Sequence, residues 1–256
     1  MDKELSRIID LYWADYVEHK EKPFVVNPSI PIIWFGDMEA YKKSKLRVVT
    51  VALNPSDKEF RKDNQLSFFR FKNGEKIHSK TKLDETEKSI LKETLSNYFK
   101  DEPYDNWFNC FEKPLNALDS SYKCGENIAL HIDIYTALAT NPTWGGLKKE
   151  EKQMLTDGNA RSKELFNSLM EYLSPDVILY SANKTEFKKT FSLTKNDCIK
   201  CYPSSSKGFN IEVYRYQKHF IITGRNNYGK PFKLKDEFVK QTLTQITEDF
   251  KEVFYK

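Results

Sequence analysis

Apolar residues along the chain fall into two patterns, which are continuous runs and repeats at helical spacing. Residues 47–53 (RVVTVAL) and 128–138 (IALHIDIYTAL) are continuous apolar and β-branched runs, a pattern typical of strands buried on both faces. Residues 177–180 form a third such run directly after a Ser-Pro-Asp turn. Shorter strands are predicted at 32–35, 211–216 and 219–223.

Helical spacing of apolar residues predicts the remaining elements. In residues 5–20 the apolar side chains recur every three or four positions, which places them on one face of a helix. The pattern over 149–173 predicts a long helix interrupted near Gly158, because glycine weakens a helix interior. Further helices are predicted at 83–100, 105–118, 183–191 and 238–254.

Alternation of strands and helices predicts the fold class. We expect an α/β protein, a three-layer α/β/α sandwich around a central, mainly parallel sheet of four or five strands. No repeat or linker divides the sequence, so residues 1–256 are predicted to form a single domain, with 1–45 packed on it as a helical and extended region. Ligands of such sheets bind beyond the carboxyl ends of the strands. The polar segments 54–56, 131–144 and 224–231 are predicted to meet there.

Composition and the N-terminal sequence predict a sizeable core and a cellular location. The 256 residues are 39% hydrophobic and 14% aromatic, enough for a sizeable core. No apolar run reaches the roughly 18 residues that a membrane span needs. The N-terminal residues are charged and amphipathic and lack the apolar core of a signal peptide. The expected location is therefore the cytoplasm.

Charge is distributed unevenly. Residues 182–235 hold 12 lysines and arginines against 3 aspartates and glutamates, although the whole chain has a net charge of only +4. A basic face on an otherwise slightly acidic protein indicates a polyanionic partner such as nucleic acid, and a solvated lysine-rich surface is the alternative.

Four cysteines raise the question of a metal. Cys198 and Cys201 have the spacing of metal ligands, and Cys110 and Cys124 could supply a second pair for zinc or an iron–sulfur cluster. Free thiols are the favoured interpretation, so no cofactor and no metal are expected.

Three segments carry the candidate chemistry. Residues 48–60 read VVTVALNPSDKEF, residues 131–144 read HIDIYTALATNPTW, and residues 219–232 read HFIITGRNNYGKPF. In this order they resemble the motifs of the uracil-DNA glycosylase superfamily, nearest the mismatch-specific uracil/thymine DNA glycosylases. In that branch the first motif is Gly-Ile-Asn-Pro-Gly and the last is Asn-Pro-Ser-Gly. The resemblance spans roughly residues 47–232 through short motifs, and it implies the glycosylase-like version of the sandwich.

The resemblance implies a base-flipping enzyme that hydrolyses an N-glycosidic bond in DNA and leaves an abasic site. Asn54 matches the position that holds the attacking water, and Asn226 begins the last motif; both are candidate catalytic residues. The candidate base-binding residues are Pro55, Ser56, Asp133 and, as stacking aromatics, Phe68 or Phe69, with Phe71 less suited. The candidate DNA-binding residues are Arg225, Asn227, Tyr228, Gly229 and Lys230, with Lys230, Pro231 or Phe232 as the wedge.

Departures from the family pattern shape the expected substrate. The first motif has Asn54 where the classical uracil enzymes have a water-activating aspartate, so catalysis would rest on positioning and charge stabilisation. On the second strand, Asp133 stands where uracil enzymes commonly have an asparagine that reads the base. A carboxylate only accepts hydrogen bonds, which suits the amino group of cytosine and opposes O4 of uracil. A modified cytosine of phage DNA, and hence antiviral defence, is one expectation; uracil in DNA repair is the other.

Other interpretations remain open for the same residues. Asn54 can simply begin a turn, Asp133 can cap or pair, and Phe68 and Phe69 can be core residues. The alternative function is a non-catalytic nucleic-acid-binding protein on the same fold. A hydrolase of small nucleosides is disfavoured because it needs no basic face.

Overall fold

The structure is a computed structural model that describes residues 2–180, 182, 184–204, 210–224, 232 and 236–255, with the backbone alone at Asn159 and Lys184. The chain groups into two compact units. Unit 1 comprises Met1–Gly36, Leu53–Tyr104 and Ile132–Leu173; unit 2 comprises Asp37–Ala52, Asp105–His131 and Ser174–Lys256. The single-domain organisation stays a prediction.

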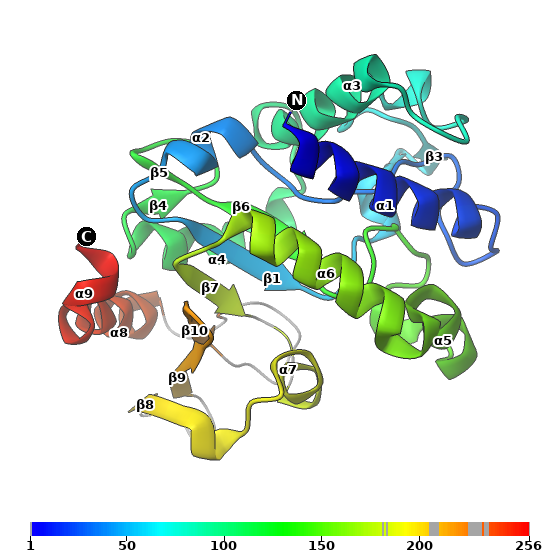
Figure 1. The fold of residues 1–256 in the computed structure, drawn as a ribbon. Helices are drawn as coiled ribbons and strands as arrows, with labels where there is room; N and C mark the ends of the chain where they lie inside the picture. Colours follow the sequence, from blue (N-terminus) through cyan, green and yellow to red (C-terminus); the bar gives the residue numbers. More distant parts are fainter. Residues whose placement is uncertain are drawn as a thin grey trace. The chain divides into compact units, whose positions relative to one another are not determined.

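A mixed, mostly parallel sheet flanked by helices makes this an α/β protein, as predicted. Its six strands among the described residues run in the order β6-β1-β7-β10-β9-β8 (Figure 1). The strand β7 pairs in parallel with β1 and β10, and β9 pairs antiparallel with β10 and β8. The bounds are β1 (Val48–Ala52), β6 (Leu130–Asp133), β7 (Val177–Tyr180), β8 (Cys198–Pro203), β9 (Asn210–Tyr216) and β10 (His219–Gly224).

The central strands are buried along their whole length. Every residue of β1, β7 and β10 is buried, which explains why most of their residues are apolar or β-branched. On one face, Phe187 of the helix α7 (Lys184–Phe191) packs on Tyr214 of β9, with ring centroids 4.8 Å apart. On the other face, Asp249 of the helix α8 (Asp236–Asp249) pairs with Lys200 of β8 (2.6 Å). Helices therefore cover both faces of this part of unit 2.

The prediction of four or five strands is wrong because β8 was missed. Most of its residues are exposed, so the sequence CIKCYP carries no apolar run. The register of β8 on β9 also shifts between Cys198 and Lys200, which disrupts the alternation that identifies an edge strand. The predicted strand at 32–35 is wrong as well: residues 32–34 have no regular structure, and Phe35 forms only an isolated bridge.

The predicted helices are present with bounds that differ by a few residues, and the predicted helices 149–173 and 238–254 are each divided in two. The long 149–173 pattern breaks at Asp157 and Gly158, which both have positive φ, as the sequence indicated. Residues 128–138 contain only β6 and part of a short strand, and the remainder is loop. The helices are α1 (Lys3–His19), α3 (Glu85–Ser96), α5 (Lys149–Thr156) and α6 (Ala160–Leu173) in unit 1, and α2 (Met38–Lys43), α4 (Asp105–Asn116), α7 (Lys184–Phe191), α8 (Asp236–Asp249) and α9 (Lys251–Phe254) in unit 2. The two-residue strands are β2 (Arg61–Lys62), β3 (Gln65–Leu66), β4 (Ser120–Ser121) and β5 (Asn127–Ile128).

Within the described ranges, no helix has both the length and the apolar character that crossing a bilayer requires.

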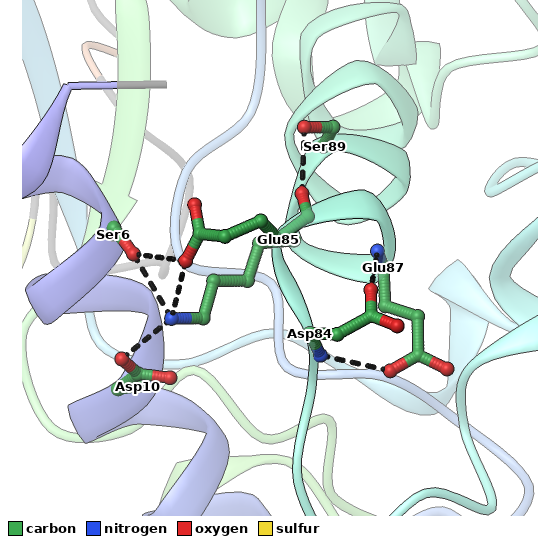
Figure 2. A network of polar contacts seen from close by, with 7 residues as sticks. Ser6, Asp10, Asp84, Glu85, Glu87 and Ser89 are labelled. Carbon is green, nitrogen blue, oxygen red and sulfur yellow. Dashed lines mark hydrogen bonds and ion pairs between the residues drawn. The ribbon is translucent and has the colours of Figure 1, made fainter.

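A buried lysine joins α1 to α3 in unit 1. Lys88 has a 7% exposed side chain, and its Nζ donates to Asp10 (2.6 Å), Ser6 (2.9 Å) and Glu85 (3.1 Å). Figure 2 shows Ser6, Asp10 and Glu85 pointing toward this point from the two helices. The N-terminus of α3 is fixed nearby, because Asp84 and Glu87 form a reciprocal capping box.

Replacing Lys88 tests this junction. We expect Lys88→Met to lower the free energy of unfolding by about 1–2 kcal/mol, since it removes a charged donor from partners that water still reaches in part. Urea unfolding measures the change. The control is Lys82→Met at an exposed position, which should stay within roughly 0.5 kcal/mol of wild type. Equal stability of the two variants would show that the junction contributes little.

Candidate functional site

The turn after β1 is built around the side chain of Asn54. Its Nδ2 donates to the carbonyl oxygen of Pro55 (2.7 Å) and to Oγ1 of Thr140 (2.8 Å). Its Oδ1 accepts from the backbone N–H of Trp144 (3.1 Å). Both amide protons are thus committed, and the oxygen keeps one further acceptor direction.

These bonds join the first motif to the second. The backbone adds two bonds between the same segments, from the N–H of Tyr135 to the carbonyl of Leu53 (3.0 Å) and from Thr140 to Pro55 (3.2 Å). The turn role of Asn54 is therefore directly explained by its contacts. Its role in holding water stays a prediction, and only Oδ1 could perform it.

Pro55 and Ser56 continue the turn into a short 3-10 helix. Pro55 is buried, and Ser56 is half-buried. The Oγ of Ser56 accepts from the N–H of Lys58 (3.3 Å) and so caps the 3-10 turn Asp57–Glu59. Glu59 is the third residue of this 3-10 helix, and it is buried.

Glu59 is the residue that the sequence analysis missed. Its side chain is 4% exposed, and its Oε2 accepts from the hydroxyl of Tyr98 (2.6 Å). Burial raises the pKa of Glu59 to about 7, against the lowering effect of Tyr98 and Arg70. No sequence pattern indicates that Glu59 is buried, because Asp57 and Glu59 are both next to Lys58 and only the fold determines which of the two carboxyl groups is buried.

Asp133 ends β6 in the same unit and is 8% exposed. Its negative charge contributes to raising the pKa of Glu59 and that of Tyr12 on α1. Two buried carboxyl groups of unit 1 therefore interact electrostatically. Neither the reading of a base by Asp133 nor its alternative capping role is tested by these contacts.

The candidate stacking aromatics differ in their surroundings. Phe71 is fully buried, with its ring stacked on Phe60 at 5.0 Å. Phe68 and Phe69 are half-buried. The guanidinium carbon of Arg70 lies 4.4 Å from the ring centroid of Phe69. The ring of Phe68 packs edge-on against that of Phe60, with the two centroids 5.8 Å apart. A flipped base would thus compete with Arg70 at Phe69 and with His78 at Phe68, where the two ring centroids are 5.2 Å apart.

The last motif falls outside the described residues. This concerns Arg225, Asn226, Asn227, Tyr228, Gly229, Lys230 and Pro231. Phe232 is described and is 4% exposed, with its ring 6.5 Å from that of Phe111 in unit 2. A buried ring does not act as a wedge, so this wedge assignment for Phe232 is not supported.

The cysteines are all free thiols. Across the described ranges, no group of three or more His, Cys, Asp or Glu side chains is arranged to hold a metal ion. In the basic segment, Lys195, Arg215 and Lys218 are exposed, as either a solvated or a polyanion-binding face requires.

A cavity of about 770 Å³ lies elsewhere, within unit 2. Its lining includes Lys45, Cys124, Asn127 and Tyr255. None of the described candidate catalytic or base-binding residues lines it.

Comparisons with protein-family models and with curated proteins found no match.

The raised pKa of Glu59 predicts a pH-dependent stability. Between about pH 4.5 and 7 the unfolded chain has lost the proton of Glu59 while the folded protein keeps it, so folding takes up a proton. The free energy of unfolding should fall as pH rises through this window, by roughly 3 kcal/mol relative to Glu59→Gln. Urea unfolding at several pH values measures the difference.

An exposed glutamate provides the control for this comparison. The free energy of unfolding of Glu75→Gln, a variant at an exposed position, should change with pH in the same way as that of wild type. Parallel curves for wild type and Glu59→Gln would contradict a protonated Glu59 in the folded protein.

Proposed function

We propose that this protein is a DNA glycosylase. It flips a base out of DNA and adds water across the bond between C1′ of the deoxyribose and the base nitrogen. The hydroxyl goes to C1′, and the bonding electron pair leaves with the base, which takes up the proton. The proposed substrate is a pyrimidine, and the acceptor character of Asp133 favours a cytosine-type base over uracil.

The observation that carries the proposal is the hydrogen-bonded junction at Asn54. The resemblance implies that the first and second motifs act together, and Asn54 bonds directly to Thr140 and Trp144 of the second motif. The mostly parallel sheet is in keeping with a glycosylase-like three-layer sandwich. We propose that the chain adopts this three-layer α/β/α architecture.

Each described site residue has a proposed task. The free acceptor direction of Asn54 Oδ1 holds the attacking water. Pro55 and Ser56 line the base pocket beside it, Phe68 stacks on the base, and Asp133 accepts from its amino group. With no strong base at the position of Asn54, the rate enhancement comes from positioning and from stabilised charge. Asn226 and its neighbours are proposed to support the flipped nucleotide.

A non-catalytic nucleic-acid-binding protein is the second candidate. The specific observation in its favour is that three hydrogen bonds to the chain already explain Asn54 without any chemistry. Such a protein would keep the exposed basic residues and the turn, and it would leave DNA intact.

Incubation with DNA of defined base content separates the two candidates. Duplexes and single strands carrying cytosine, hydroxymethylcytosine, glucosylated hydroxymethylcytosine, uracil or thymine are treated and then assayed for abasic sites. We expect abasic sites in DNA with a modified cytosine. Salt-dependent binding with no abasic product would instead establish the binding protein. Cleavage of uracil DNA alone would overturn the role of Asp133.

Substitution at Asn54 tests the water-holding role against the turn role. Asn54→Ala should lower turnover about 100-fold or more while DNA affinity is kept. Thr140→Val is the matched control, because it breaks the same tether from the other side and leaves the carboxamide in place. We expect this control to lose less than about tenfold. Equal losses in both variants would assign Asn54 to the turn alone.

A further inference from the structure

Glu59 has one carboxyl oxygen engaged and one available. Its Oε2 accepts from Tyr98, whose hydroxyl in turn accepts from the N–H of Tyr104 (3.0 Å). The proton of Tyr98 is therefore directed at Glu59. Among the described residues, Oε1 of Glu59 has no hydrogen-bond partner, and it is not among the fully enclosed polar atoms. This oxygen can meet a ligand.

The charges facing Glu59 come from Arg70 and Asp133. Arg70 Nε lies 3.7 Å from Oε2, too far for a hydrogen bond. The same guanidinium stacks on Phe69 and donates through Nη1 to the carbonyl of Glu102. Arg70 thus only partly offsets burial and the charge of Asp133, and the pKa of Glu59, raised to about 7, means that the carboxyl is mostly protonated at pH 6 and mostly ionised at pH 8.

A protonated carboxyl at Glu59 is a hydrogen-bond donor, and the carboxyl oxygens of Asp133 are acceptors. The Watson–Crick edge of cytosine offers the complement, with an acceptor at N3 and donors on the amino group at C4. Uracil presents the reverse, a donor at N3 and an acceptor at O4, and would face two mismatched contacts. Enzymes that flip bases commonly read this edge.

We propose that Glu59 donates a hydrogen bond from Oε1 to N3 of a cytosine-type base while Asp133 accepts one from its amino group. The two residues then act together as the specificity determinant of the pocket. This inference rests on the proposed function for its substrate class and adds to it the residue that completes base recognition.

Binding to DNA that cannot be cleaved tests the pair. The probes are single-stranded oligonucleotides with one 2′-fluoro-2′-deoxycytidine or one 2′-fluoro-2′-deoxyuridine, because the fluorine blocks loss of the base. Fluorescence anisotropy gives the ratio of the two dissociation constants at pH 6 and pH 8. We expect wild type to favour cytidine about tenfold at pH 6 and to lose most of this preference at pH 8.

Glu59→Gln is the decisive variant. Tyr98 holds the amide oxygen, so the amide NH₂ takes the place of Oε1 and donates at any pH. The cytidine preference should therefore persist at pH 8. Glu59→Ala should lose it at both pH values, and Asp133→Asn should shift the preference toward uridine.

The outcomes separate this inference from the proposed function. A wild-type preference that is absent, or unchanged between pH 6 and pH 8, overturns the role of Glu59, even if abasic sites form in the cleavage assay. A preference that depends on pH in wild type and not in Glu59→Gln supports it. That result without any abasic product would overturn only the glycosylase.

Discussion

The hydrogen bonds of the Asn54 carboxamide determine the arrangement of the candidate site in unit 1. A strand that ends in a turn does not by itself fix where the next residues go. Here both amide protons and the oxygen are bonded to the chain, and two of these bonds reach residues 86 and 90 positions further along the sequence. Because the turn is fixed in this way, Ser56 can cap a short 3-10 helix that directs Glu59 into the interior.

As a consequence of this turn, the carboxyl group of Glu59 is buried and interacts with the charge of Asp133, which affects its protonation. Placing two carboxyl groups in a poorly solvated region is unfavourable, and burial raises the pKa of Glu59 to about 7 although Arg70 Nε lies 3.7 Å from its Oε2. Groups whose pKa is moved toward neutrality by burial and a charged neighbour are enriched at functional sites, although structural networks do the same. In the proposed glycosylase, the protonated Glu59 is the second residue that reads the base, together with Asp133.

The sequence predicted several buried elements correctly, although the buried segment 32–35 is not a strand, and it missed the exposed edge strand. The strand β7 occupies the predicted residues, and the break near Gly158 is present, because apolar runs and positive-φ positions leave local signals. The edge strand β8 leaves none, since its residues are exposed and its register shifts.

The same contrast holds for the site. Asn54 was singled out because it follows an apolar run, and Asp133 because of the family resemblance. Glu59 was not singled out because its burial depends on contacts with Tyr98 and Arg70, 39 and 11 residues further along the chain. The role of Phe232 as a wedge was suggested by position alone, and its packing against Phe111 could not be read from the sequence.

Carbon-13 NMR of the side-chain carboxyls reports directly on whether Glu59 and Asp133 are coupled. In wild type the Glu59 resonance should titrate near pH 7, and in Asp133→Asn its midpoint should move to lower pH because a neighbouring negative charge is gone. A Glu59 resonance that titrates near the ordinary value of about 4.5, or one that Asp133→Asn leaves unmoved, would contradict a carboxyl pair at this site.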